Sequence, residues 1–413
     1  MRAPGGGAAG FFGWRVVAGA FVLAVLGWGL GFYGPPVFLH AVQTQRGWPV
    51  ALVSAAVTAH YLLGAVLAAN LPGLHARFGA SAVTRAGVAA LALGLVGWAS
   101  AEAPWHLFVA AALTGCGWST MAAAAINLIV SQWFVAGRPK ALSMAYNGGS
   151  IGGMVFSPLW VLLIDAMGFQ AAVALVGGVA VVVVWWLAAA VFSRSPASMG
   201  QFPDGVAPSP GAGGAVGAAV AALPGGLLWR NWQFRTLAVG MALGLFAQIG
   251  LLSHLFSLIV PALGGGTAGV VMGLATASAI AGRTVFGWLM PAGADRRRMA
   301  ALSYAVQIGG GAFLILSGLQ EPAMMVLGIL LFGFGIGNAT SVPPLIAQVE
   351  FAREDSGRAV ALIVAIGQAT YAFAPAAFGM LRDGDVTGGS VAVFLAAIGF
   401  QGLAIAAFLL GRR

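Results

Sequence analysis

Charge is what this 413-residue sequence has least of: Asp, Glu, Lys and Arg together make up 7% of its residues. Ordinary soluble domains carry about 25% charged residues. Hydrophobic residues instead reach 60%, and they form long uninterrupted runs. A soluble globular protein is therefore excluded. The composition predicts an all-α membrane protein that crosses the bilayer several times.

Cysteine is almost absent as well. Cys116 is the single one, which excludes an internal disulfide and a cysteine metal site. The sequence also has no phosphate-binding glycine loop, no set of metal ligands and no pairing of a nucleophile with a base. We therefore expect no enzyme activity, no cofactor and no metal.

Stretches long enough to cross a bilayer recur throughout the chain. A transmembrane helix needs about 20 mostly apolar residues, and breaks at charges, prolines and glycine clusters leave twelve such stretches. We expect spans at roughly 14–39, 50–72, 81–101, 104–133, 140–163, 169–192, 235–262, 267–291, 299–319, 323–349, 357–381 and 388–411.

The basic residues fall on one side of these spans. Twelve spans put both termini on the same side, and all but three of the 19 Lys and Arg residues lie there. The exceptions are Arg46 and Arg382 at the other face and Arg283 within a span. Short cytoplasmic loops are rich in Lys and Arg, so we expect both termini to be cytoplasmic, in the cytoplasmic (inner) membrane. Because the basic residues are scattered singly, the net charge of +9 indicates the lipid bilayer as partner and no nucleic acid.

The two halves of the chain resemble each other. "QWFVAGRPKALSMAYNGGSIGGMVFSP" follows the fourth span and "QVEFAREDSGRAVALIVAIGQATYAFAP" follows the tenth, each with a charged turn and then a helix that contains a proline (Pro158, Pro375). Residues 193–232 are rich in Pro, Gly and Ser, as is typical of a flexible linker. We therefore predict two six-helix pseudo-repeat bundles, 1–192 and 233–413, joined by a cytoplasmic linker at 193–232. A binding site is expected at their interface near the midplane of the membrane.

With these spans in place, the chain resembles the major facilitator superfamily over nearly its whole length. "GRPKALSMAYNGGSIGGMVFSPL" is similar to the fifth-helix signature of its branch of monocarboxylate porters and oxalate/formate exchangers, and "GRTVFGWL" is similar to the eighth helix of that branch. There the eighth-helix arginine binds the substrate carboxylate, so the resemblance implies that role for Arg283. The chain departs from the family at Ala76, where an aspartate is usual, and at Ala279, where animal porters have an acidic residue.

Arg283 also stands out from the residues alone. It is the only formally charged side chain between Thr236 and Ala294, and an unpaired guanidinium is costly in an apolar medium. Thr276 lies seven residues before it on the same helix face, and the planar guanidinium fork matches a carboxylate. Two interpretations remain open: Arg283 binds an anion, or its side chain snorkels to the cytoplasmic boundary.

Other polar groups inside the spans are weaker candidates. His254 is either a proton carrier or ligand for a substrate oxygen, or a neutral histidine bonded to a neighbouring helix. Gln368 and Tyr371 share a helix face, where packing and ligand binding are both open. The remaining candidate substrate-binding residues, each with a structural hydrogen bond as the alternative, are Gln248, Asn147, Tyr33 and Tyr61.

Two glycine patterns predict local structure. Gly148/Gly152 and Gly149/Gly153 form overlapping small-x-x-x-small pairs, which indicate close packing of the fifth span against a neighbour. The tract "LFGFGIGNATSVPPLI" interrupts the tenth span with glycines and two prolines, and it predicts a bend there.

The expected function follows from these charges. No Asp or Glu lies deep within a predicted span, which disfavours a cationic drug as cargo, and a single deep positive charge fits a monoanion. We predict a monomeric secondary transporter that moves a small organic monoanion, such as a monocarboxylate, by alternating access. Proton symport through His254, exchange and facilitation remain open. The alternatives are an exporter of an uncharged or weakly polar metabolite, with Arg283 structural, and a non-transporting membrane sensor.

Overall fold

The computed structural model describes residues 10–206, 225–289, 294–351, 353–384 and 390–412. In this part of the chain, twelve helical segments are long and apolar enough to cross a membrane. Their bounds confirm the twelve predicted spans. The largest difference is in the first span, which continues to Arg46 and not only to residue 39. The protein is therefore a multi-pass membrane protein.

Within the described residues, the first half contains eight α-helices and the second half nine. Those of the first half are α1 (Gly13–Gly31), α2 (Gly34–Arg46), α3 (Val50–Phe78), α4 (Ala80–Ser100), α5 (Pro104–Ser119), α6 (Ala123–Ser131), α7 (Arg138–Met167) and α8 (Phe169–Ala190). Those of the second half are α9 (Gly225–Arg230), α10 (Trp232–Leu263), α11 (Gly265–Trp288), α12 (Arg296–Leu316), α13 (Pro322–Ala339), α14 (Val342–Glu350), α15 (Arg353–Tyr371), α16 (Ala374–Gly384) and α17 (Ser390–Leu410).

Four spans consist of two consecutive helices: α1–α2, α5–α6, α13–α14 and α15–α16. Prolines explain three of these breaks, because a proline removes an N–H donor and disfavours helical backbone in the residue before it. Pro35 follows the break at Phe32 and Tyr33, Pro343 follows the break in the tenth span, and Pro375 follows the break in the eleventh. The predicted bend in the tenth span is therefore confirmed as a break between Ala339 and Val342.

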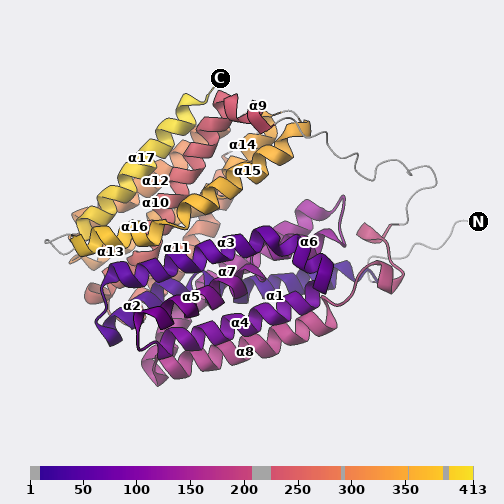
Figure 1. Ribbon diagram of the computed structural model, residues 1–413. Helices are drawn as coiled ribbons and strands as arrows, with labels where there is room; N and C mark the ends of the chain where they lie inside the picture. Colours follow the sequence, from indigo (N-terminus) through magenta and orange to yellow (C-terminus); the bar gives the residue numbers. More distant parts are fainter. Residues whose placement is uncertain (1–9, 207–224, 290–293, 352, 385–389, 413) are drawn as a thin grey trace, which may run out of the picture.

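The helices form two groups, α1–α8 and α10–α17, that lie side by side (Figure 1). We call the end of the molecule that carries residues 193–206, α9 and the end of α17 the linker face, and the opposite end the far face. The two groups converge toward the far face and diverge toward the linker face (Figure 1). Which face is cytoplasmic stays a prediction, as do the domain boundaries at 192 and 233.

The glycines of α7 bring it into direct contact with α1, as predicted. A Cβ on Gly148 would overlap the carbonyl oxygen of Phe21, and one on Gly152 would lie 2.5 Å from the carbonyl oxygen of Val25. Such distances are available only to residues without a side chain. The next pair of glycines faces other groups: Gly149 packs on the ring of Trp28, and Gly153 faces the ring of Tyr33 and Thr276 of the second helical group.

Beyond α8 the chain stays attached to the first bundle at the linker face. The carboxylate of Asp204 accepts hydrogen bonds from the backbone N–H groups of Val135 (3.0 Å), Ala136 (2.8 Å) and Gly137 (3.0 Å). Burial by itself raises the pKa of Asp204, but these bonds and the charge of Arg138 lower it below its ordinary value. The beginning of the connection is thus fixed beside the first turn of α7.

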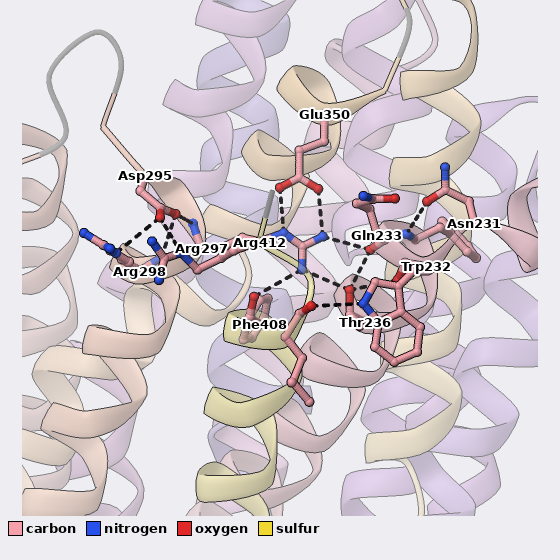
Figure 2. A network of polar contacts seen from close by, with 12 residues as sticks. Asn231, Trp232, Gln233, Thr236, Asp295, Arg297, Arg298, Glu350, Phe408 and Arg412 are labelled. Carbon is pink, nitrogen blue, oxygen red and sulfur yellow. Dashed lines mark hydrogen bonds and ion pairs between the residues drawn. The ribbon is translucent and has the colours of Figure 1, made fainter.

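A network of charges fixes the second bundle at the linker face (Figure 2). Arg297, buried at the start of α12, donates from Nε and Nη2 to the two carboxylate oxygens of Glu350 at 2.6 and 2.7 Å. Its other donors reach Thr236 Oγ1 (3.1 Å) and the carbonyl oxygens of Gln233 (2.8 Å) and Phe408 (3.3 Å). One side chain therefore joins α10, α12, α14 and α17.

Candidate functional site

Arg283 points from α11 into the interface between the two bundles. Its backbone lies five residues before the end of α11 at Trp288, but a helical side chain leans toward the helix N-terminus, here toward the far face. Nη2 donates a hydrogen bond of 3.1 Å to Ser150 Oγ on α7. Ser150 lies twelve residues into α7, which is about 18 Å from that end of the helix. The hydrogen bond therefore directs Arg283 inward, away from the linker face.

The guanidinium of Arg283 has few partners for a charged group. The side chain is half-buried, and Ser150, its one hydrogen-bond partner among the described residues, is neutral. Nε is buried and has no hydrogen-bond partner in the described part of the chain. Gly337 of α13 allows this approach, since a Cβ there would lie 3.1 Å from Nε. Within the same described ranges, no carboxylate forms an ion pair with Arg283.

Tyr33, a predicted site residue, lies near this arginine, and Thr276, another predicted site residue, lies next to Tyr33. A Cβ on Gly153 would meet the Tyr33 ring and lie 2.8 Å from Cγ2 of Thr276. Tyr33 and Thr276 are also within side-chain hydrogen-bonding reach, and Tyr33 interacts electrostatically with Arg283. Tyr33 occupies the break between α1 and α2, so helices from both bundles contribute to this group.

A row of aromatic rings continues from Tyr33 across the interface. The Phe32 ring centroid lies 5.0 Å from that of Tyr33 and 6.2 Å from that of Tyr61 on α3. Tyr61 in turn meets Tyr371 at the end of α15 edge to face, with centroids 5.8 Å apart. Such edge-to-face pairs are favourable. The structure therefore brings together four predicted residues around Arg283 and along this row: Thr276, Tyr33, Tyr61 and Tyr371.

His254 does not belong to this group. It is fully buried on α10, where Nε2 lies 3.0 Å from the carbonyl oxygen of Pro375. A carbonyl only accepts, so Nε2 carries the proton and Nδ1 is the acceptor, facing Nη1 of Arg382 at 3.4 Å. A proton on Nδ1 would oppose a cationic donor. These contacts favour the neutral histidine bonded to a neighbouring helix.

Within the described part of the chain, the three remaining candidate residues make no contact with Arg283. Gln248 is buried, and its Oε1 has no hydrogen-bond partner among the described residues. Gln368 is half-buried on α15. Asn147 is exposed on α7, three residues before Ser150 and therefore on nearly the same helix face, one turn nearer the linker face. Of these, Asn147 is best placed to meet a molecule approaching Arg283.

Sequence reasoning did not select Ser150. A serine in a glycine-rich helix has no charge or periodicity to distinguish it from the packing residues around it, and its partner is 133 positions away in the chain. The signal in the sequence is the Gly-Ser-x-Gly-Gly run in α7, which indicates the family branch and close helix packing but not a contact with Arg283.

The arrangement of two bundles, broken spans and a charged group at their interface defines a secondary-transporter architecture. The chain belongs to the Major Facilitator Superfamily, whose family model matches residues 17–375. This confirms the predicted resemblance to the superfamily.

Relatives by sequence are monocarboxylate transporters. Monocarboxylate transporter 11 of Mus musculus is 30% identical over 183 residues, which cover 43% of this chain and 39% of that protein. Monocarboxylate transporter 12 of Rattus norvegicus is 24% identical over 419 residues, covering 94% of this chain and 82% of that protein. The chain thus matches about two fifths of the length of the first relative. Both relatives are consistent with the monocarboxylate branch.

Solved structures support the fold. The nucleoside transporter NupG, as its D323A mutant, superposes with a TM-score of 0.76 at 12% identity, covering 96% of this chain and 100% of that one. A bacterial homologue of the human lysosomal transporter Spinster, in an inward-facing, unoccupied conformation, gives a TM-score of 0.69 at 14% identity, covering 97% and 98%. At these identities the likeness shows the fold alone.

Proposed function

We propose that this transporter moves a small organic monoanion, a monocarboxylate, and that Arg283 binds its carboxylate. The observation that carries the proposal is the chemical state of Arg283: a half-buried guanidinium between the bundles that, among the described residues, bonds only a neutral hydroxyl. A charged group in such surroundings is stabilised by an opposite charge, and the sequence-related transporters carry monocarboxylates by name.

The geometry of a second arginine in the same chain supports this role. Arg297 holds the carboxylate of Glu350 through Nε and Nη2, the side edge of the guanidinium. In Arg283, Nε has no hydrogen-bond partner within the described ranges, and Nη2 donates to Ser150. The edge that binds a carboxylate in Arg297 is therefore bound only to a hydroxyl in Arg283. A substrate carboxylate that displaces the Ser150 hydroxyl gains a charge-assisted bond at Nη2, and a small rotation of the side chain brings Nε to its second oxygen.

The groups around Arg283 would then contact the rest of the substrate. Tyr33 offers a hydroxyl group near the guanidinium, and Thr276 offers another next to Tyr33, and the row of rings leads toward Tyr371. A molecule with one carboxylate and a small, weakly polar body fits these groups. A dianion would leave its second charge without a partner among them. The asymmetry of Lys and Arg supports a cytoplasmic membrane location with the linker face inward.

The test is uptake of labelled acetate, lactate and pyruvate into liposomes, with succinate as the dianion control. Arg283→Lys keeps the charge and loses the fork, so both Arg283→Lys and Arg283→Ala are expected to lose about 100-fold or more of uptake. Wild-type uptake by Arg283→Ala would instead assign the arginine a structural role and favour an uncharged cargo.

Ser150 supplies a matched pair of variants. Ser150→Asp places a permanent carboxylate within reach of Nη2, so it competes with the substrate and should abolish uptake. Ser150→Asn introduces a side chain of nearly the same size as aspartate but without a charge, and this variant should retain most of the uptake. Equal activity of the two variants would contradict anion binding at Arg283.

A further inference from the structure

Among the helix pairs that join the two bundles toward the far face, which also include α7 with α11 and α2 with α10, α3 and α16 make a contact with paired hydrogen bonds. Three residue pairs follow one another in antiparallel register along this contact: Ala51 with Asp383, Ser54 with Gly379, and Thr58 with Ala376. All three pairs join residues more than 300 positions apart in the chain. The contact is therefore made and broken only by movement of one bundle relative to the other.

The donors of both hydrogen bonds in this contact are backbone N–H groups in the first turn of a helix. Ala51 is the second residue of α3, and Ala376 is the third residue of α16. N–H groups at these positions have no carbonyl partner within their own helix. The residue before α3 is Pro49, which provides no side-chain cap. These two N–H groups depend on partners from outside their helices.

Each bundle supplies the missing partner for the other. Oδ2 of Asp383, in the second bundle, accepts from Ala51 N at 2.7 Å. Oγ1 of Thr58, in the first bundle, accepts from Ala376 N at 3.0 Å. A carboxylate at a helix N-terminus is further stabilised by the helix dipole. The two helices therefore cap each other across the interface.

Gly379 allows this reciprocal capping at short range. A Cβ there would lie 2.5 Å from Oγ and 2.6 Å from Cβ of Ser54, and 3.3 Å from Cα of Ala51. The backbones of α3 and α16 thus touch midway between the two capping bonds. Because both helices are continuous through this region, the two bonds break together when the helices separate.

We propose that Asp383 and Thr58 form a far-face latch, in which reciprocal capping of α3 and α16 stabilises the conformation closed at that face. The latch rests on alternating access, which is typical of the family, and does not depend on the identity of the substrate. Opening of the far face exchanges both capping bonds for bonds to water. Loss of either side-chain cap then shifts the conformational equilibrium toward the far-face-open form by about tenfold.

The test uses a reporter cysteine in protein reconstituted into liposomes. Replacing the single native cysteine by Cys116→Ser gives a cysteine-free background. Ser157→Cys then places a thiol at a buried position of α7, beside Gly269 of α11 in the far half of the interface. A membrane-impermeant maleimide reaches this thiol from the far face only when that face opens, and no substrate is needed.

Asp383→Ala and Thr58→Val should each raise the labelling rate about tenfold. Asp383→Asn and Thr58→Ser keep an acceptor oxygen, so they should label at nearly the wild-type rate. Glu102→Ala removes an exposed carboxylate from a connection within the first bundle, and it should have no effect. A Thr84→Cys reporter, buried within the first bundle, must stay unlabelled in every variant, which separates opening from unfolding.

Unchanged labelling of the Ser157→Cys reporter in both Asp383→Ala and Thr58→Val would overturn the latch. So would an effect of Asp383→Asn as large as that of Asp383→Ala, since charge and not capping would then be responsible. Failure of the anion proposal appears separately, as uptake that does not depend on Arg283 while the labelling results stand.

Discussion

Arg297 and Glu350 are joined by two parallel hydrogen bonds, Nε to Oε1 at 2.6 Å and Nη2 to Oε2 at 2.7 Å, with the Arg297 side chain 2% exposed (Figure 2). This pair belongs to the linker-face framework of the second bundle. Two arginines of the same half thus have opposite circumstances: Arg297 has a fixed internal carboxylate, and Arg283 has a hydroxyl.

Removal of one partner of this pair should destabilise the second bundle. Glu350→Ala leaves a buried guanidinium without its counter-charge, and we expect a loss of about 3 kcal/mol in the free energy of unfolding. Thermal unfolding in detergent measures the effect. Arg298→Ala is the control, because Arg298 is 65% exposed and its contact with Asp295 is 3.4 Å long; surface pairs of this kind contribute little. An unchanged midpoint for Glu350→Ala would contradict a structural role for the pair.

Two glycines of α11 give a test of packing around Arg283. A Cβ on Gly282 would overlap the carbonyl oxygen of Phe334 on α13, whereas a Cβ on Gly287 meets nothing within 4 Å. Gly282→Ala should push α11 and α13 apart and cost about 1–3 kcal/mol of stability. It should also lower uptake, because α11 and α13 together position the guanidinium.

Gly287→Ala is the matched control for that change. It adds the same methyl group to the same helix, and it should leave both the unfolding midpoint and uptake unchanged. Similar losses in the two variants would mean that helix flexibility, and not the contact with α13, is what Gly282 provides.

His254 offers a test of proton coupling. Glutamine has a donor and an acceptor and can replace both bonds of the neutral imidazole, to the carbonyl of Pro375 and to Arg382. We therefore expect His254→Gln to transport within about twofold of wild type, with an unchanged pH profile. His254→Leu removes the donor to the Pro375 carbonyl, while Arg382 keeps its bond to Ser257 Oγ, and the variant should cost about 1–3 kcal/mol of stability. Loss of pH dependence in the glutamine variant would instead assign proton transfer to His254.

The spans and the isolated charge of Arg283 were accessible from local patterns. Hydropathy over about 20 residues is a property of neighbouring positions, so the predicted spans agree closely with the helices of the structure. The same holds for Gly148 and Gly152, whose spacing alone indicates a close helix contact. A single formal charge within the 59 residues 236–294 also needs no partner to be noticed.

The partners of those residues were not accessible in this way. Ser150 contacts Arg283 because α7 of one bundle packs against α11 of the other. The residues near Ser150 in the chain do not indicate that contact. The position of His254 was equally undetermined: its sequence surroundings fit a site residue, and only the packing of α16 on α10 puts the Pro375 carbonyl and Arg382 against it.

The order of apolar and charged residues along the chain determined that this protein is a twelve-span membrane protein with one charge to account for, since burial in lipid acts on each helix separately. Tertiary structure alone decided which groups surround that charge and which helices close the far face. Those outcomes depend on how two bundles pack against each other, through contacts such as Asp383 with Ala51 that span most of the sequence.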